Sequence, residues 1–282
     1  MSSPTKIERH IQSQPQIEGY REIVSPKNSR LTYLTFGLVH LSGETLEYRS
    51  HLREEEAILT LIQGEGMVEI REATGTKLQF PIGPRKNPFT EKASMVYVPP
   101  KASFKVISKE GGMELAFHKA PARKQGFALH IRPEDISTTP TGKDNWRRDI
   151  SLGTTLDLPI QRLVIGETVS APGNWSSYPP HKHDERNLPT EYPLEEIYYF
   201  LVNPNQGFGL MRVYDSPKRR DRLDEAFVIQ NGDTVVISRG YHPVVAAPGY
   251  QLYYLYALAG RERRHGTWSD DPAHQWVRDA KS

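Results

Sequence analysis

Short apolar runs separated by polar turns recur along the whole chain. Those of the first half are of strand length and rich in β-branched and aromatic residues: Leu31–Val39, Ala57–Ile62, Gly66–Ile70, Ser94–Val98 and Ser103–Ile107. The second half continues with Gln161–Val169, Glu196–Val202, Phe208–Tyr214, Ala226–Ile229, Thr234–Ser238 and Gln251–Leu258. No long stretch has the 3.6-residue periodicity of an amphipathic helix. The pattern therefore predicts an all-β protein built from many short strands.

The two halves follow a similar order of strands and turns. In each half a strand leads through a glycine-containing turn into the next strand, at Gln63–Gly66 and at Asn203–Gly207. A turn with proline or glycine later follows a valine-rich strand, at Val98–Pro100 and at Ser238–Gly240. This repetition indicates a duplicated barrel or sandwich unit. The joint is expected in the polar stretch Arg132–Arg148.

Composition narrows the class of protein. A chain of 282 residues with ordinary apolar content can bury a sizeable core. The net charge of +2, without a nucleic-acid-binding motif, gives no reason to expect a nucleic-acid partner. No apolar run is long enough for a membrane span or signal peptide, so no membrane partner is expected and the expected location is the cytoplasm. Because there is no cysteine, any metal must be held by nitrogen and oxygen atoms.

The segment His181-Lys-His183 carries the strongest chemical signal in the chain. Side chains two residues apart on a strand share a face, so the two imidazoles can reach one metal ion. Downstream, Glu195-Glu196 opens an apolar run, and His242 follows a valine-rich strand and its turn. These three elements can together supply three imidazoles and one carboxylate.

A His, His, Glu, His set suits Zn, Mn, Fe, Co or Ni, with Zn or Mn favoured here, and leaves coordination positions open. The competing interpretation is that His181 and His183 are surface histidines of a proline-rich loop. Glu195 is the rival carboxylate, and Glu196 is preferred because it stands at the start of the apolar run. The first half has the acidic stretch Glu54–Glu56 but no His-x-His pair, so it is expected to be metal-free.

Several sequence runs resemble the cupin superfamily, and more narrowly the uronate isomerase family. That family contains the 5-deoxy-glucuronate isomerases of inositol catabolism and the 4-deoxy-5-threo-hexosulose-uronate isomerases. The runs in the second half are Pro172–Asp184, Leu194–Tyr199, Asn203–Phe208, Leu223–Glu225, Gly232–Asp233, Arg239–Pro243 and Gly249–Tyr254. The first half shows a looser resemblance at Leu41–Glu44, Tyr97–Pro100 and Arg132–Asp135. Two features depart from the pattern: Asp184 to Glu195 is longer than the matching segment of a generic cupin, and the tail Gly260–Trp268 differs in detail.

The resemblance implies two cupin-type β-barrels in one chain, a bicupin. It implies one divalent metal ion, held by the residues that match His181, His183, Glu196 and His242. The expected organisation is a polar arm at residues 1–30, a metal-free barrel at 31–130, a connecting segment at 131–160 and a metal-binding barrel with its tail at 161–282. A homo-oligomer acting on a small sugar acid is expected.

The implied reaction interconverts 5-deoxy-D-glucuronate and 5-dehydro-2-deoxy-D-gluconate, an aldose to ketose change that moves hydrogen from C2 to C1. A metal with open positions can hold the oxygens at C1 and C2 and stabilise the charge that develops there. Either a general base moves the C2 proton or a hydride shifts with the help of the metal. The candidate bases are Glu195, Asp184 and Tyr254. Regular strand alternation points Glu195 away from Glu196.

The substrate carboxylate calls for a fixed cation, preferably a forked guanidinium. Arg212, Arg186, Arg239 and Lys182 lie within or near the motif runs and are the candidates for substrate binding. Arg212 is on a predicted strand, whereas Lys182 alternates away from the two histidines. For each of the four, the alternative is a solvated surface charge.

Three other functions fit the same residues. The chain could be the related 4-deoxy-5-threo-hexosulose-uronate isomerase, a cupin iron oxygenase, or a sugar-binding bicupin without catalytic activity. Oxygen uptake separates an oxygenase from an isomerase, because isomerisation consumes no oxygen. Assays with both uronates separate the two isomerases, and a non-catalytic protein forms no product.

Overall fold

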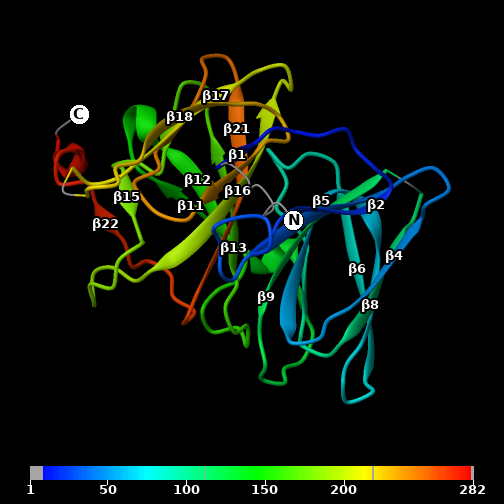
Figure 1. Cartoon of the computed structure of the whole chain (residues 1–282). Helices are drawn as coiled ribbons and strands as arrows, with labels where there is room; N and C mark the ends of the chain where they lie inside the picture. Colours follow the sequence, from blue (N-terminus) through cyan, green and yellow to red (C-terminus); the bar gives the residue numbers. More distant parts are fainter. Residues whose placement is uncertain (1–8, 111, 218, 281–282) are drawn as a thin grey trace, which may run out of the picture. The chain divides into compact units, whose positions relative to one another are not determined.

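A computed structural model describes residues 9–110, 112–217 and 219–280 of the chain. Contacts divide the chain into two compact units (Figure 1). Unit 1 contains Pro15–Ser137 and Leu152–Ile165, whereas unit 2 contains β1, Thr138–Ser151 and the chain from Gly166 onward. The expected boundaries at 30, 130 and 160 thus differ from the observed division. The part of the expected polar arm at residues 1–8 lies outside the described residues.

Both units consist of antiparallel strands, in agreement with the all-β prediction. The strands that lie mainly in unit 1 are β2 (Gly19–Val24), β3 (Thr35–Leu41), β4 (Glu47–His51), β5 (Glu55–Arg71), β6 (Lys77–Arg85), β7 (Met95–Val98), β8 (Ser103–Ser108), β9 (Met113–Pro121) and β10 (Leu129–Ile131). Those that lie mainly in unit 2 are β1 (His10–Ile11), β11 (Thr138–Thr141), β12 (Arg148–Leu152), β13 (Val164–Ser170), β14 (Trp175–Ser176), β15 (His181–Lys182), β16 (Leu194–Asn203), β17 (Gly209–Tyr214), β18 (Asp224–Ile229), β19 (Thr234–Ile237), β20 (Val244–Ala246), β21 (Gln251–Gly260) and β22 (Ser269–Asp270). The helices in the described residues are short 3-10 turns, η1 (Pro133–Asp135), η2 (Asp144–Trp146) and η3 (Gln275–Arg278).

Unit 1 is organised around β5, a strand of 17 residues. It pairs with β7 and β9 along its first half and with β6 and β8 along its second half. Sequence analysis predicted two strands here with a turn between them, but the chain continues through that point with a shift of register at Gly64 and Gly66. Gly64 has a φ of +105°, which permits the irregularity, because glycine has no Cβ to hinder this conformation. The core of the unit is apolar and includes Phe104, Phe117 and Val106.

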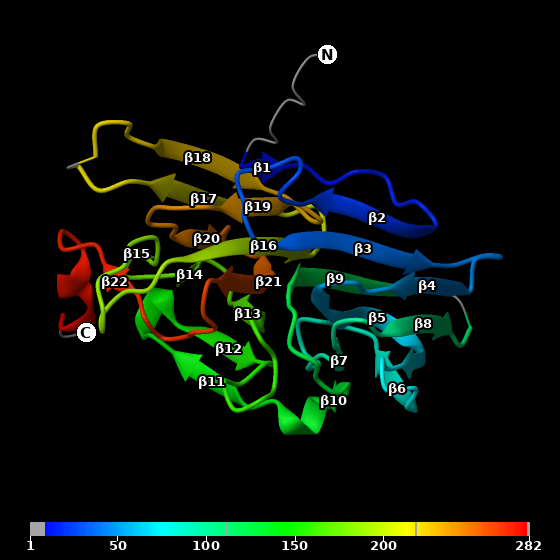
Figure 2. The same ribbon diagram turned by 60° about the horizontal axis from the view of Figure 1, so that its bottom comes forward.

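Unit 2 has a seven-stranded sheet in the order β1-β19-β16-β21-β13-β12-β11 and a four-stranded sheet in the order β14-β20-β17-β18 (Figure 2). The longest pairing joins β16 to β21 over ten residues, from Leu194 opposite Gly260 to Asn203 opposite Gln251. Both strands are almost wholly buried, as their apolar sequences predict. The pair β15 and β22 forms a separate small sheet.

The segment expected to connect two barrels has structure of its own. Residues 138–152 supply β11 and β12 to the seven-stranded sheet, and Leu152–Ile165 belongs to unit 1. Within the described residues, no helix has the length and apolar character needed to cross a membrane.

Candidate metal centre

The segment with the two histidines is held as an extended strand by long-range pairing. In β15, His181 lies opposite Asp270 and Lys182 lies opposite Ser269 of β22. Strand alternation then sends the side chain of Lys182 away from the two imidazoles, as the sequence predicts. The Lys182 ammonium lies 2.8 Å from a carboxylate oxygen of Glu191.

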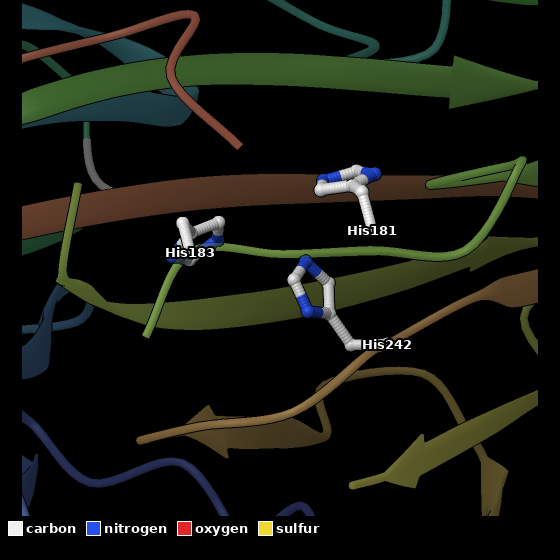
Figure 3. Close-up of side chains that lie close together, drawn as sticks. All are labelled: His181, His183 and His242. Atoms are coloured by element: carbon white, nitrogen blue, oxygen red, sulfur yellow. The ribbon is translucent and has the colours of Figure 1, made fainter. Parts of the chain in front are cut away.

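Three imidazoles meet in unit 2. One ring nitrogen from each of His181, His183 and His242 lies within 4.8 Å of the others, and the group could hold a metal ion. Figure 3 shows that His181 and His183 extend from one segment, and that His242 approaches them from another. The ring of His242 lies 4.8 Å from that of His181 and 5.1 Å from that of His183, between centroids.

The carboxylate of Glu196 lies beside this group. Its Oε2 is 3.1 Å from Nε2 of His183 and 3.4 Å from Nε2 of His242. Glu196 is 4% exposed and stands in β16 between its partners Ile237 of β19 and Leu258 of β21. The preferred glutamate, Glu196, therefore lies beside two of the imidazoles.

Backbone carbonyls orient two of the rings. Nδ1 of His183 lies 2.8 Å from the carbonyl oxygen of Leu194, and Nδ1 of His242 lies 2.9 Å from that of Gly240. A ring that donates Nδ1–H to a carbonyl keeps its Nε2 lone pair for a ligand bond, as is usual for metal-binding histidines. Nε2 of His242 is buried and has no hydrogen-bond partner within the described chain. A buried Nε2 atom with a free lone pair is suited to bind a metal ion.

The electrostatics of the group agree with this fit. Burial lowers the pKa of His242 to about 4 and holds the pKa of His181 well below its usual range, so both rings are neutral at pH 7. Burial also disfavours the charged form of His183, but the hydrogen bond and charge of Glu196 outweigh it and raise the pKa of that ring. A buried carboxylate requires compensating positive charge, and a cation among these four side chains would supply it.

Two tyrosines, one of which faces an imidazole, form hydrogen-bonded pairs with two serines. The rings of Tyr198 and Tyr254 stack at 4.4 Å between centroids, and Tyr198 lies 5.9 Å from the ring of His242. The Tyr198 hydroxyl bonds to Ser177 at 2.9 Å, and the Tyr254 hydroxyl bonds to Ser176 at 2.5 Å. Tyr254, a predicted candidate base, is therefore connected to the metal-binding group through the ring of Tyr198.

Asp184 has a different environment. One of its oxygens lies 2.8 Å from the ammonium of Lys182. The other accepts hydrogen bonds from the Gly240 amide and from Arg219. Lys182 and Asp184 line a cavity of about 460 Å³ together with Tyr241 and other polar residues. The Asp184 carboxylate is thus engaged in linking the two histidine-bearing segments.

The predicted substrate-binding arginines lie in other surroundings. Arg212 is half-exposed on β17, and its guanidinium pairs with Asp224 at 2.7 Å. Arg239 pairs with Asp221 at 2.8 Å. Arg186 lies over a tyrosine ring. All of these contacts are made with side chains other than the imidazoles.

Three residues near the group were missed by sequence analysis. Trp268 lies 5.4 Å from the ring of His181, between centroids, and 6.4 Å from the ring of His265. Burial lowers the pKa of His265, whose charge also interacts with those of Glu196 and His183. The departure of the tail from the family pattern was the available signal for this pair. Arg148 is buried, and its charge helps to lower the pKa of His181; the polar stretch around it carried no recognisable motif.

Comparisons with known proteins agree with this picture. Residues 10–277 match the KduI/IolB family. A 5-deoxy-glucuronate isomerase from Geobacillus thermodenitrificans is 37% identical over 271 residues, which cover 95% of this chain and 94% of the relative. The 5-deoxy-glucuronate isomerase of Bacillus subtilis strain 168 is 33% identical over 256 residues, which cover 90% of this chain and 91% of the relative.

Solved structures show the same fold. The crystal structure of an IolB-like protein from Salmonella typhimurium LT2 superposes with a TM-score of 0.87 at 31% identity, covering 96% of this chain and 99% of that one. An oxalate decarboxylase from Lactobacillus farciminis superposes with a TM-score of 0.67 at 12% identity, covering 94% and 89%. The second similarity concerns the fold alone.

Proposed function

The chain belongs to the KduI/IolB family, and on this basis we propose that it is a 5-deoxy-glucuronate isomerase. The reaction converts 5-deoxy-D-glucuronate to 5-dehydro-2-deoxy-D-gluconate in myo-inositol catabolism. The observation that carries the proposal is the convergence of three imidazoles in a chain that is 33–37% identical to isomerases of that name over nearly its whole length.

We propose that His181, His183, His242 and Glu196 hold one divalent metal ion, with Zn or Mn favoured. The bound ion would polarise the oxygens at C1 and C2 and stabilise the negative charge that develops during isomerisation. The carbonyls of Leu194 and Gly240 fix the two rings that they contact, which keeps the ligand atoms directed at one point. The Glu196 carboxylate supplies the one negative charge of the set.

The hydroxyl groups of the site are assigned to the sugar. Tyr198 with Ser177 and Tyr254 with Ser176 form two hydrogen-bonded pairs that can exchange protons with substrate hydroxyls. Among the three candidate bases, Tyr254 is favoured because its ring stacks on Tyr198, whose ring lies 5.9 Å from that of His242. Asp184 is already engaged by Lys182 and the Gly240 amide, and Glu195 alternates away from Glu196.

For the fold, we propose that each unit is a cupin-type barrel, so that the whole chain is a bicupin with its metal in the carboxyl-terminal half. The similarity to oxalate decarboxylase supports this assignment. The histidine group in unit 2 is the one potential metal site found among the described residues, and the proposal assigns the metal to it. A cytoplasmic homo-oligomer completes the proposal, and light scattering during size-exclusion chromatography measures the oligomeric state.

Parallel assays test the function. Purified protein is incubated with 5-deoxy-D-glucuronate and with 4-deoxy-5-threo-hexosulose-uronate, while an oxygen electrode records oxygen uptake. We expect turnover of the first uronate at a higher kcat/KM than the second, with no oxygen consumed. Three other outcomes would each contradict the proposal. Preference for the second uronate would indicate the related isomerase, oxygen uptake coupled to turnover would indicate an oxygenase, and binding without product would indicate a non-catalytic protein.

A further inference from the structure

Arg148 is a buried arginine without an acidic partner. It begins β12 and is 9% exposed. Its hydrogen bonds are both made by Nη1, to the carbonyl oxygens of Trp146 at 3.3 Å and Tyr178 at 3.2 Å. Nε is buried without a partner, and the charges that act on this guanidinium within the described chain are those of Tyr254, Tyr198 and Arg278, with no carboxylate among them. The hydrogen bonds of the guanidinium to the described chain thus leave Nε, and the edge that it shares with Nη2, available to a ligand.

A second buried arginine shows what a purely structural arrangement looks like. Arg85 in unit 1 is 2% exposed. Its Nε and both terminal nitrogens donate to backbone carbonyls, among them those of Leu61 and Glu91. Burying a guanidinium is costly unless its donors are satisfied. Arg148 leaves the buried Nε donor unsatisfied, which indicates that the edge carrying this atom is kept for an anionic ligand.

The surroundings of Arg148 place it beside the candidate metal centre. Tyr178, whose carbonyl it contacts, stands three residues before His181, at most about 10 Å along the chain. The positive charge of Arg148 contributes to the lowered pKa of His181. The same guanidinium interacts electrostatically with the phenols of Tyr198 and Tyr254.

We propose that Arg148 binds the carboxylate of the sugar-acid substrate through its Nε–Nη2 edge. The proposal rests on the proposed isomerase function and adds the residue that selects an acid. A carboxylate accepts two parallel hydrogen bonds from a guanidinium fork, which fixes its orientation as well as its position. Arg148 would hold the carboxylate, and the imidazoles and Glu196 would face the other end of the sugar. The substrate could then bind in only one orientation.

The arginine variants Arg148→Met and Arg148→Lys test this role. Methionine removes the charge with a similar volume, and lysine keeps the charge but loses the fork. Arg147→Met is the matched control, because the neighbouring Arg147 is well exposed. Each protein is assayed with 5-deoxy-D-glucuronate and with its C6 amide, which has the same shape without the charge. Metal content and circular dichroism are measured for every variant.

We expect Arg148→Met to lower kcat/KM for the uronate by about 100-fold or more and to change that for the amide by less than about 3-fold. For Arg148→Lys we expect a smaller fall in kcat/KM for the uronate. For Arg147→Met we expect the kcat/KM of the unchanged enzyme. Equal losses on the acid and the amide, or no loss on the acid, would overturn the inference.

Binding measured by calorimetry separates this inference from the proposed function. If the unchanged protein binds 5-deoxy-D-glucuronate but does not turn it over, the isomerase proposal fails. Arg148 then keeps its role if binding is lost in Arg148→Met, and loses it if binding is retained. A protein that fails to bind the uronate at all contradicts the role of Arg148 directly.

Discussion

At the scale of single residues, strand alternation accounts for most of the candidate site. It separates Lys182 from the two neighbouring histidines and Glu195 from Glu196, and both separations follow from the sequence alone. The partners of the side chains do not follow from it. The proposed role of Arg148 in substrate binding could not be predicted from the sequence. It depends on a buried guanidinium nitrogen that has no partner in the described chain, and only the folded structure shows this.

Replacing Glu196 tests the choice between the adjacent acids. Glu196→Gln removes the negative charge next to His183 and His242 with little change of shape, so we expect metal content to fall and kcat/KM to fall by more than about 100-fold. Elemental analysis and the isomerase assay measure the two effects. The matched control is Glu195→Gln, which should retain its metal; loss of metal from the control alone would exchange the roles of the two residues.

His118 on β9 predicts an acid-sensitive stability. It is fully buried, neither ring nitrogen has a hydrogen-bond partner in the described chain, and its ring stacks on Phe36. Burial lowers its pKa to about 3, against 6.5 for the unperturbed side chain. Between these values the unfolded chain binds a proton that the folded protein does not. Stability therefore falls as the pH drops from about 6.5 towards 3.

Urea unfolding at pH 7 and pH 5 measures this effect. The unfolding free energy of the unchanged protein should fall between pH 7 and pH 5. We expect this fall to be smaller by about 1–2 kcal/mol in His118→Phe. His51→Leu removes an exposed histidine and is the matched control. Parallel pH dependences for all three proteins would show that His118 is not responsible.

At the scale of elements, long buried strands were predictable and short paired ones were not. The apolar sequences of β16, β19 and β21 appear as strands close to their predicted bounds. The two-residue strands β14, β15 and β22 depend on partners far away in the sequence, so local composition says little about them. The predicted turn within β5 was wrong, because glycine there permits an irregular strand as well as a turn.

Gly64 provides a test of that irregularity. A Cβ at this position would lie 2.8 Å from Cα of Met113, and the φ of +105° is unfavourable for any other residue. We expect Gly64→Ala to reduce the unfolding free energy by about 1–3 kcal/mol or more in denaturant titrations. Gly75→Ala is the control, since Gly75 also has a positive φ but nothing within 4 Å of its Cβ position. Equal effects of the two substitutions would contradict a close packing role for Gly64.

At the scale of the whole molecule, sequence resemblance gave the family and function, whereas the division of the chain came from the structure. The repeat suggested two successive halves, but β1 belongs to the second unit and Leu152–Ile165 to the first. β1 joins the second unit by pairing with β19, and the amides of Gln161, Arg162 and Leu163 donate to the carboxylate of Glu56 in the first. Local hydrophobic patterns cannot reveal such long-range contacts. The candidate metal centre nevertheless lies wholly in the second unit, where the motif residues cluster.

The central claim is that this chain isomerises a uronate with a metal held by His181, His183, His242 and Glu196. Its most direct test is elemental analysis of the purified protein, with isomerase activity measured before chelation, after chelation and after return of the metal. We predict one divalent ion per chain, loss of turnover with the ion, and recovery when Zn or Mn is added back. Undiminished turnover by the metal-free protein would contradict the claim.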